Sequence, residues 1–200
     1  MPPPPSSRTT VQALVTLLLE ESLPGFRLVA EEEGDDLDRD DRAGVRDAVV
    51  SAVRAHLPRT PDQVLEALRR GRHAGGPEGD FWTLDPIDGT KGFLRDGQYA
   101  VALARIVDGR PVLAVLGCPN LPHGERRGCV FVAERGRGAV VFGVDDGVES
   151  VVRVDGIEAL RDAVVCESVE AAHSSHDRAA GVAAHLGIAA APVRMDSQCK

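Results

Sequence analysis

The chain of 200 residues contains no long hydrophobic segment. The longest apolar run near its start, residues 13–19, is interrupted by Thr16 and falls far short of the roughly 18 residues that a membrane-spanning helix needs. The opening residues, MPPPPSSR, lack the charged start, apolar centre and small-residue cleavage site of a secretory signal. We therefore expect a protein that has no membrane partner and is located in the cytoplasm.

Positive charge and paired cysteines are also scarce. Lys and Arg number 23 against 31 Asp and Glu, which gives a net charge of −8. This balance disfavours a nucleic-acid partner, because such proteins cover phosphates with basic side chains. No Cys-x-x-Cys pair is present, so neither a zinc site nor a disulfide framework is indicated. We expect buried or incidental thiols at the scattered positions Cys118, Cys129, Cys166 and Cys199.

The chain has enough hydrophobic residues, 43%, to bury a core. Apolar residues at helical spacing from Val11 to Leu19 predict a helix, with Thr9 or Thr10 as its N-cap and Pro24-Gly25 as its end. Further helices are expected over residues 43–56, 61–70 and 178–186, the second starting with the capping sequence Thr60-Pro61-Asp62-Gln63. Strands are expected over residues 27–30, 81–84, 99–107, 111–116, 130–133, 139–142, 151–154 and 163–166, with Asp108-Gly109 as a hairpin turn. These elements predict an α+β fold, a layered sandwich in which helices flank one antiparallel sheet.

Carboxylates follow two of the predicted strands. Asp85 and Asp88 enclose Pro86-Ile87, and a turn there would direct both carboxylates and the Ile87 carbonyl at one point. Glu31 and Glu32 follow the strand at residues 27–30 and could complete the site. Oxygen-only ligands of this kind suit Mg²⁺, which predicts a magnesium site of the two-metal type. The alternative is a proline-containing turn beside a solvated acidic cluster.

A phosphate could bind next to this site. Gly89 lets backbone amides approach an anion, and Thr90 supplies a hydroxyl. Farther along, His173 and His176 are spaced to share a helical face, although a helix cap or a solvated loop is the more common reason for such a pair.

Four segments together resemble one family. They are Leu28 to Glu32, Trp82 to Phe93 with its Asp-Pro-Ile-Asp-Gly-Thr string, Glu167 to Asp177, and Asp196 to Lys200. The chain is similar in them to the 3'(2'),5'-bisphosphate nucleotidases of the inositol monophosphatase superfamily. The resemblance implies a layered α/β sandwich and a Mg²⁺-dependent phosphatase that converts adenosine 3',5'-bisphosphate, a small-molecule by-product of sulfate-donor metabolism, into AMP and phosphate.

The resemblance also implies roles for individual residues. Glu31, Asp85, Asp88 and the carbonyl of Ile87 would bind metal, with Glu32 supporting Glu31. Gly89 and Thr90 would hold the phosphate, and Thr90 would also orient the attacking water as a catalytic residue. Three residues would contact the nucleotide: His173, Ser197 and Lys200. By the same comparison, residues 1–8 are a proline-rich start, residues 9–155 a metal- and phosphate-binding first domain, and residues 156–200 the beginning of a second, nucleotide-contacting domain.

Two departures from the family pattern bear on activity. Arg8 stands where the family has the aspartate that activates water together with the threonine, and the family's later Trp-Asp segment has no counterpart in this sequence. We therefore expect an enzyme truncated at both ends, with slow turnover. Two alternatives stay open, a non-catalytic protein that binds metal or nucleotide and a phosphatase for inositol phosphates. The oligomeric state is not indicated.

Overall fold

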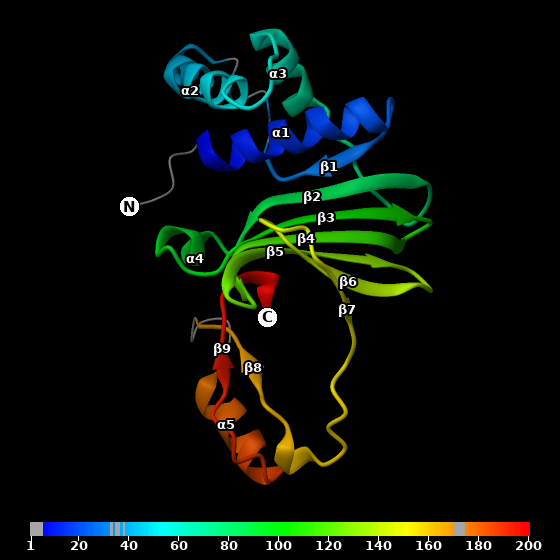
Figure 1. Ribbon diagram of the computed structural model, residues 1–200. Helices are drawn as coiled ribbons and strands as arrows, with labels where there is room; N and C mark the ends of the chain where they lie inside the picture. Colours follow the sequence, from blue (N-terminus) through cyan, green and yellow to red (C-terminus); the bar gives the residue numbers. More distant parts are fainter. Residues whose placement is uncertain (1–5, 33, 35–36, 38, 170–174) are drawn as a thin grey trace.

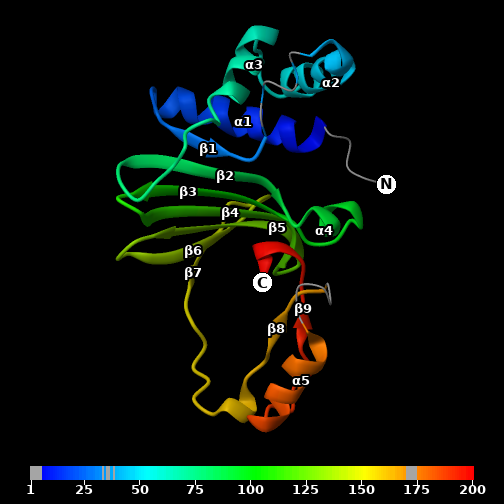
Figure 2. The ribbon, with the colours of Figure 1, turned by 180° about the vertical axis from the view of Figure 1, so that it is seen from behind.

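The computed structural model describes residues 6–32, 34, 37, 39–169 and 175–200 and shows a layered arrangement (Figures 1 and 2). A layer of helices covers one face of a large sheet, and the later part of the chain forms a smaller unit beyond the opposite face. The expected α+β fold is confirmed. None of the described helices is both long and apolar enough to cross a membrane.

The helical layer consists of α1 (Ser6–Ser22), α2 (Ala43–Arg54) and α3 (Pro61–Arg69), with a short 3₁₀ helix, η2 (Asp40–Arg42), before α2. The capping box predicted for α3 is present, since Gln63 donates its backbone N–H to the Thr60 hydroxyl at 3.3 Å and accepts the Thr60 N–H at 2.8 Å. A hydrophobic cluster joins the three helices through Ala13, Leu17, Val49, Val53, Val64 and Leu68. The layer thus has its own core.

Helix α1 differs from its prediction in two respects. It begins at Ser6, so Thr9 and Thr10 lie inside the helix and the expected N-cap was wrong, whereas its end before Pro24-Gly25 is confirmed. The buried residues are not the predicted apolar stripe alone, because α1 is covered on two sides: Ala13 packs among the helices and Val15 against the sheet. Polar Gln12 is therefore fully buried between the layers, while Leu18 is half exposed.

The large sheet has seven strands in sequence order. They are β1 (Leu28–Ala30), β2 (Asp80–Asp88), β3 (Ala100–Val107), β4 (Arg110–His123), β5 (Arg126–Glu134), β6 (Gly138–Gly143) and β7 (Glu149–Val152). Within this sheet, as far as the structure describes it, β1 and β2 pair in parallel and each later pair is antiparallel. The predicted hairpin between β3 and β4 is confirmed, and Asp108 and Gly109 both have positive φ, 47° and 69°, as a tight two-residue turn requires.

The smaller unit contains η3 (Leu160–Asp162), β8 (Cys166–Glu167), α5 (His176–His185), β9 (Val193–Arg194) and η4 (Ser197–Cys199). The strand predicted over residues 163–166 was wrong except at Cys166, because β8 covers only Cys166 and Glu167. β8 and β9 pair in parallel with each other and not with the large sheet. The division into residues 9–155 and 156–200 stays a prediction.

Candidate phosphate and metal site

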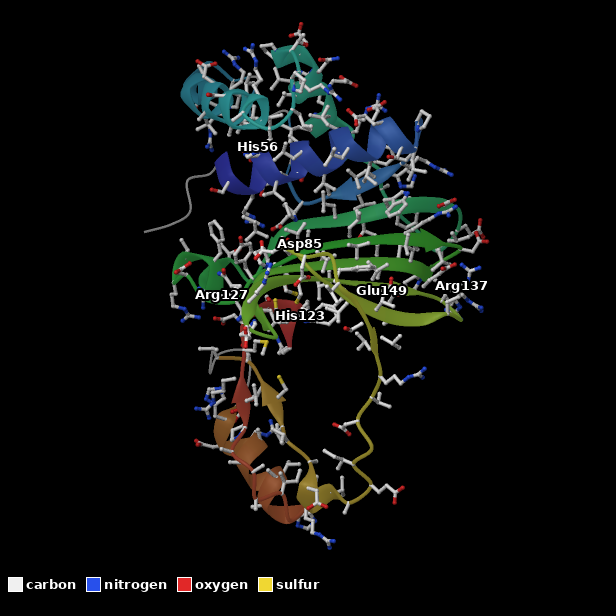
Figure 3. All side chains as sticks on the ribbon, in the orientation of Figure 1. His56, Asp85, His123, Arg127, Arg137 and Glu149 are labelled. Atoms are coloured by element: carbon white, nitrogen blue, oxygen red, sulfur yellow. The ribbon has the colours of Figure 1, made fainter. Side chains whose placement is uncertain are left out.

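The first part of the site is the end of β2. The strand continues through Pro86 to Asp88, so the turn predicted between Asp85 and Asp88 was wrong; instead the pairing with β3 is irregular over these residues. The backbone N–H of Ile87 donates to Asp85 Oδ1 at 3.1 Å, and the Thr90 hydroxyl donates weakly to the Ile87 carbonyl at 3.5 Å. Asp85 lies at the end of the sheet that carries the short helix α4 (Thr90–Leu94) (Figure 3).

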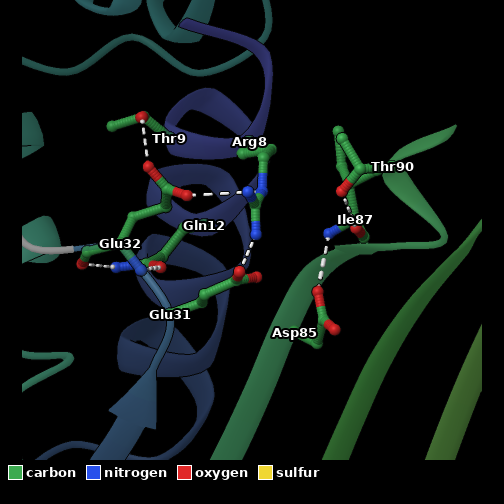
Figure 4. Close-up of polar contacts among 8 residues, drawn as sticks. All are labelled: Arg8, Thr9, Gln12, Glu31, Glu32, Asp85, Ile87 and Thr90. Atoms are coloured by element: carbon green, nitrogen blue, oxygen red, sulfur yellow. Dashed lines mark hydrogen bonds and ion pairs between the residues drawn. The ribbon is translucent and has the colours of Figure 1, made fainter. Parts of the chain in front are cut away.

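The second part follows β1, where α1 holds both glutamates (Figure 4). The side-chain amide of Gln12 donates to the Glu32 carbonyl at 2.8 Å and accepts the Glu32 N–H at 2.9 Å. Thr9 donates its hydroxyl to Glu32 Oε2 at 3.2 Å. The guanidinium of Arg8 forms an ion pair with Glu31, and its Nε lies 3.3 Å from Glu32 Oε1. Both carboxylates are therefore engaged by side chains of α1.

The pKa of the Asp85 carboxyl is perturbed by its surroundings. Burial raises the pKa of Asp85 above its ordinary value, and the negative charge of Asp88 adds to the increase. The Ile87 N–H and the more distant Arg8 guanidinium lower the pKa, but they do not reverse the shift. The Arg8 charge consequently acts on Asp85 as well as on the two glutamates.

The predicted metal ligands form no cluster ready to bind a metal: among the residues that the structure describes, no group of three or more His, Cys, Asp or Glu side chains is arranged to hold an ion. Asp85 and Asp88 are nonetheless near enough for the charge of Asp88 to act on Asp85. The oxygen donors Asp85, Ile87 and Asp88 suit Mg²⁺ chemically, whereas Glu31 does not fit a metal as it stands because Arg8 already holds it. The assignment of these residues as ligands stays a prediction.

Several other predicted site residues do come together. A pocket of about 420 Å³ lies between the Asp88–Gly92 segment and the end of the chain. Its lining includes Asp88, Gly89, Thr90, Ser197 and Lys200, all of which the sequence singled out. His173 lies outside the described residues. Residues predicted to bind metal, phosphate and nucleotide thus gather around a single pocket, although the two groups are separated by about a hundred positions in the sequence.

Direct contacts hold the two walls of this pocket together. The backbone N–H of Gln198 donates to Asp88 Oδ2 at 2.5 Å, and Arg95 donates to both carboxylate oxygens of Asp196 at 3.1 Å. Gly89 has φ of +84° and lies so close to Ser197 that an added Cβ would be 2.5 Å from the Ser197 Cβ. The small size of Gly89 therefore permits the close approach of η4.

Sequence reasoning missed five lining residues, which are Lys91, Gly92, Ser168, Asp196 and Gln198. Asp196 was inside a segment used for the family resemblance, but nothing in the sequence indicated its pairing with Arg95. Lys91 directly follows Gly89-Thr90 and was the easiest to find, because a cation beside a predicted phosphate site is electrostatically favourable. The Lys200 ammonium group donates to the Ser197 carbonyl at 2.6 Å, and both residues belong to the wall formed by the end of the chain.

Two thiols lie behind the pocket wall. Buried Cys118 of β4 forms a hydrogen bond with Cys199 of η4, whose sulfur also lies 3.2 Å from the Tyr99 carbonyl. The hydrogen bond from Cys118 lowers the pKa of Cys199 to about 7, against a smaller opposing effect of burial. The same hydrogen bond raises the pKa of Cys118, and burial raises it further. Cys199 is therefore the thiol of the pair that ionises first.

We expect alkylation of Cys199 by iodoacetamide to reach half its maximal rate near pH 7. Thiolate is the reactive form, so a lowered pKa moves the reactivity to lower pH than the value of ~8.5 typical of a free cysteine. The measurement is the alkylation rate of the Cys199 peptide as a function of pH, followed by mass spectrometry. In the Cys118→Ala variant the donor is gone, and the midpoint should rise; an unchanged midpoint would show that Cys118 does not stabilise the thiolate.

The chain matches the inositol monophosphatase family over residues 7–200, and it belongs to this family.

Within the family the chain is similar to several nucleotidases. It is 40% identical to 3'(2'),5'-bisphosphate nucleotidase 1 of Arabidopsis thaliana, in an alignment that covers 94% of this chain and 60% of the relative. It is 34% identical to the 3'(2'),5'-bisphosphate nucleotidase of Schizosaccharomyces pombe, over 94% of this chain and 58% of that protein. The chain thus spans about 60% of the length of the curated relatives it matches.

Solved structures of similar proteins are more distant. SuhB of Mycobacterium tuberculosis has 20% sequence identity, with a TM-score of 0.49, 96% of this chain covered and 67% of that one. CysQ from Bacteroides thetaiotaomicron, described as a bacterial member of the inositol monophosphatase family, has 16% identity and a TM-score of 0.47, with 96% and 71% covered.

Proposed function

We propose that this chain belongs to a Mg²⁺-dependent phosphatase that removes the 3'-phosphate of adenosine 3',5'-bisphosphate. The observation that carries the proposal is the single pocket lined by Asp88, Gly89, Thr90, Ser197 and Lys200. The similarity to bisphosphate nucleotidases over nearly the whole chain also supports the proposal.

The pocket offers complementary groups to a phosphorylated nucleotide. Thr90 and Lys91 begin α4 at one wall, and Lys200 belongs to the other wall. Hydroxyl and ammonium groups are suitable partners for phosphate oxygens. The Thr90 hydroxyl donates to the Ile87 carbonyl, so its oxygen can accept a hydrogen bond from a water molecule.

Mg²⁺ would be held by the Asp85 and Asp88 carboxylates and the Ile87 carbonyl. When bound, such an ion polarises a phosphate and lowers the pKa of a water ligand. The acidic net charge of the chain does not oppose an anionic substrate at this place, because a bound cation reverses the local field.

A second candidate is a non-catalytic protein that binds metal or nucleotide. The ion pair between Arg8 and Glu31 favours it, since that pair engages one of the predicted metal ligands.

The experiment is phosphate release by the purified chain with saturating Mg²⁺, comparing adenosine 3',5'-bisphosphate with inositol 1-phosphate and identifying the nucleotide product by chromatography. We expect AMP as the product and faster turnover of the bisphosphate. Asp85→Asn should lower kcat/KM by at least about 10- to 100-fold, the loss typical when a residue that only supports a metal ligand is changed.

The matched control is Asp80→Asn, at the opposite end of the same strand, where Asp80 pairs with Arg105 on the surface. It should leave turnover unchanged. Preference for inositol 1-phosphate would favour a phosphatase for inositol phosphates. Turnover that is absent, or that survives Asp85→Asn, would contradict the proposed catalytic role.

A further inference from the structure

Arg8 places a positively charged side chain beside the carboxylates of Glu31 and Glu32. Its guanidinium pairs with Glu31 and lies beside Glu32 (Figure 4). The Arg8 side chain is 25% exposed and the Glu31 side chain 45%, so the pair is partly shielded from water. Shielding of this kind strengthens an ion pair relative to one in full solvent.

The position of this charge is fixed by the surrounding structure. Arg8 lies in α1, and the same helix fixes the backbone after β1 through the two hydrogen bonds between Gln12 and Glu32. Thr9 holds the second carboxylate oxygen of Glu32. Because one helix positions both the guanidinium and the carboxylates, their contact does not require a chance arrangement of flexible side chains.

Arg8 and a divalent ion would compete for the same carboxylate oxygens. A divalent ion needs carboxylate oxygens that are free to coordinate it. Arg8 takes up Glu31, and the Nε of Arg8 lies 3.3 Å from Glu32 without forming a hydrogen bond to it, so the contact with Glu32 is mainly electrostatic. A metal ion at Glu31 would have to displace Arg8 or be repelled by it.

We propose that the Arg8 guanidinium occupies the cation position of the Glu31–Glu32 pair, so that this half of the acidic site binds no divalent ion while the ion pair is formed. The metal-binding half of the site then consists of Asp85, Asp88 and the Ile87 carbonyl. This assignment of the metal ligands rests on the proposed function. Arg8 thereby limits the number and affinity of divalent ions that the chain takes up.

The test is titration of the purified chain with Mn²⁺ alone, with bound ion followed by electron paramagnetic resonance and by the shift in thermal unfolding. Arg8→Gln should bind Mn²⁺ about tenfold more tightly or take up an additional ion, because the guanidinium no longer competes for the Glu31 carboxylate. Arg8→Lys keeps the charge and should resemble the original chain. The matched control is Arg59→Gln, which removes the ion pair with Glu21 on the helical layer and should change nothing in Mn²⁺ binding.

A second variant keeps the proposal testable even if Arg8→Gln folds poorly. Glu31→Gln in the original chain should leave the number of bound Mn²⁺ ions unchanged, whereas in the Arg8→Gln background it should abolish the gain. If Glu31→Gln alone lowers the number of bound ions, or if folded Arg8→Gln shows no gain, the proposal is overturned. These readouts do not involve turnover, so failure of the proposed phosphatase activity would be seen separately in the phosphate-release assay.

Discussion

Replacing Gly89 by alanine is expected to cost about 2 to 5 kcal/mol of stability and to release η4 from the sheet. A left-handed backbone costs a residue with a side chain about 1 to 2 kcal/mol, and φ at Gly89 is +84°. The new Cβ would also meet Ser197, with its Cβ at 2.5 Å and its Cα at 3.1 Å, so the wall must move. Overpacking of this kind typically costs a further ~1 to 3 kcal/mol.

The measurement is chemical denaturation followed by the fluorescence of Trp82, the one tryptophan of the chain, which is 8% exposed in β2. Release of η4 should appear as faster alkylation of Cys199. The matched control is Gly136→Ala, because Gly136 has nearly the same φ, +80°, with no atom within 4 Å of an added Cβ. Equal losses in the two variants would show that the contact with Ser197 contributes nothing.

Replacing Gln12 by leucine is expected to destabilise the chain by about 2 to 5 kcal/mol. Gln12 is completely buried and bonds both backbone groups of Glu32, the N–H and the C=O. Leucine has a similar size but offers no partner, and each buried polar group left unsatisfied costs about 1 to 3 kcal/mol. Trp82 fluorescence in denaturant again measures the loss.

The matched control for this prediction is Gln63→Leu. It makes the same chemical change in an exposed capping box of α3, and it should cost no more than about 1 kcal/mol because water replaces the lost partner. A cost of Gln12→Leu as small as that of the control would mean that Glu32 does not depend on α1 for its backbone hydrogen bonds.

Local features of the fold were predictable because neighbouring residues determine them. The capping box at Thr60 and Gln63 and the Asp108-Gly109 hairpin depend on residues within a few positions of each other. The buried face of α1 was predicted only in part, since the hydrophobic pattern cannot show that a helix is covered on two sides. Buried Gln12 is understandable only together with its partner Glu32, twenty positions away.

The candidate site shows the same limit. The sequence singled out Asp88, Gly89 and Thr90 as one group because they are adjacent. Their contact with η4 depends on a hydrogen bond between Asp88 and Gln198, which are 110 positions apart, and no periodicity or spacing indicates it. The position of Arg8 in the sequence was noted as unusual, but the direction of its side chain toward Glu31 follows only from the packing of α1 beside β1.

The parallel pair β8–β9 determines how the pocket can open. Both strands run toward the pocket, and Ser168 and Asp196, which follow them, line the same cavity. The Arg194 side chain donates to the buried carboxylate of Glu167 at 2.8 Å, which joins the two strands. Because the two strands are joined, we expect Ser168 and Asp196 to move together when the pocket opens, against the contacts at Gly89, Arg95 and Asp88. Amide hydrogens of Met195 to Cys199 should consequently exchange with solvent as a group, earlier than those of the central strands β3 and β4.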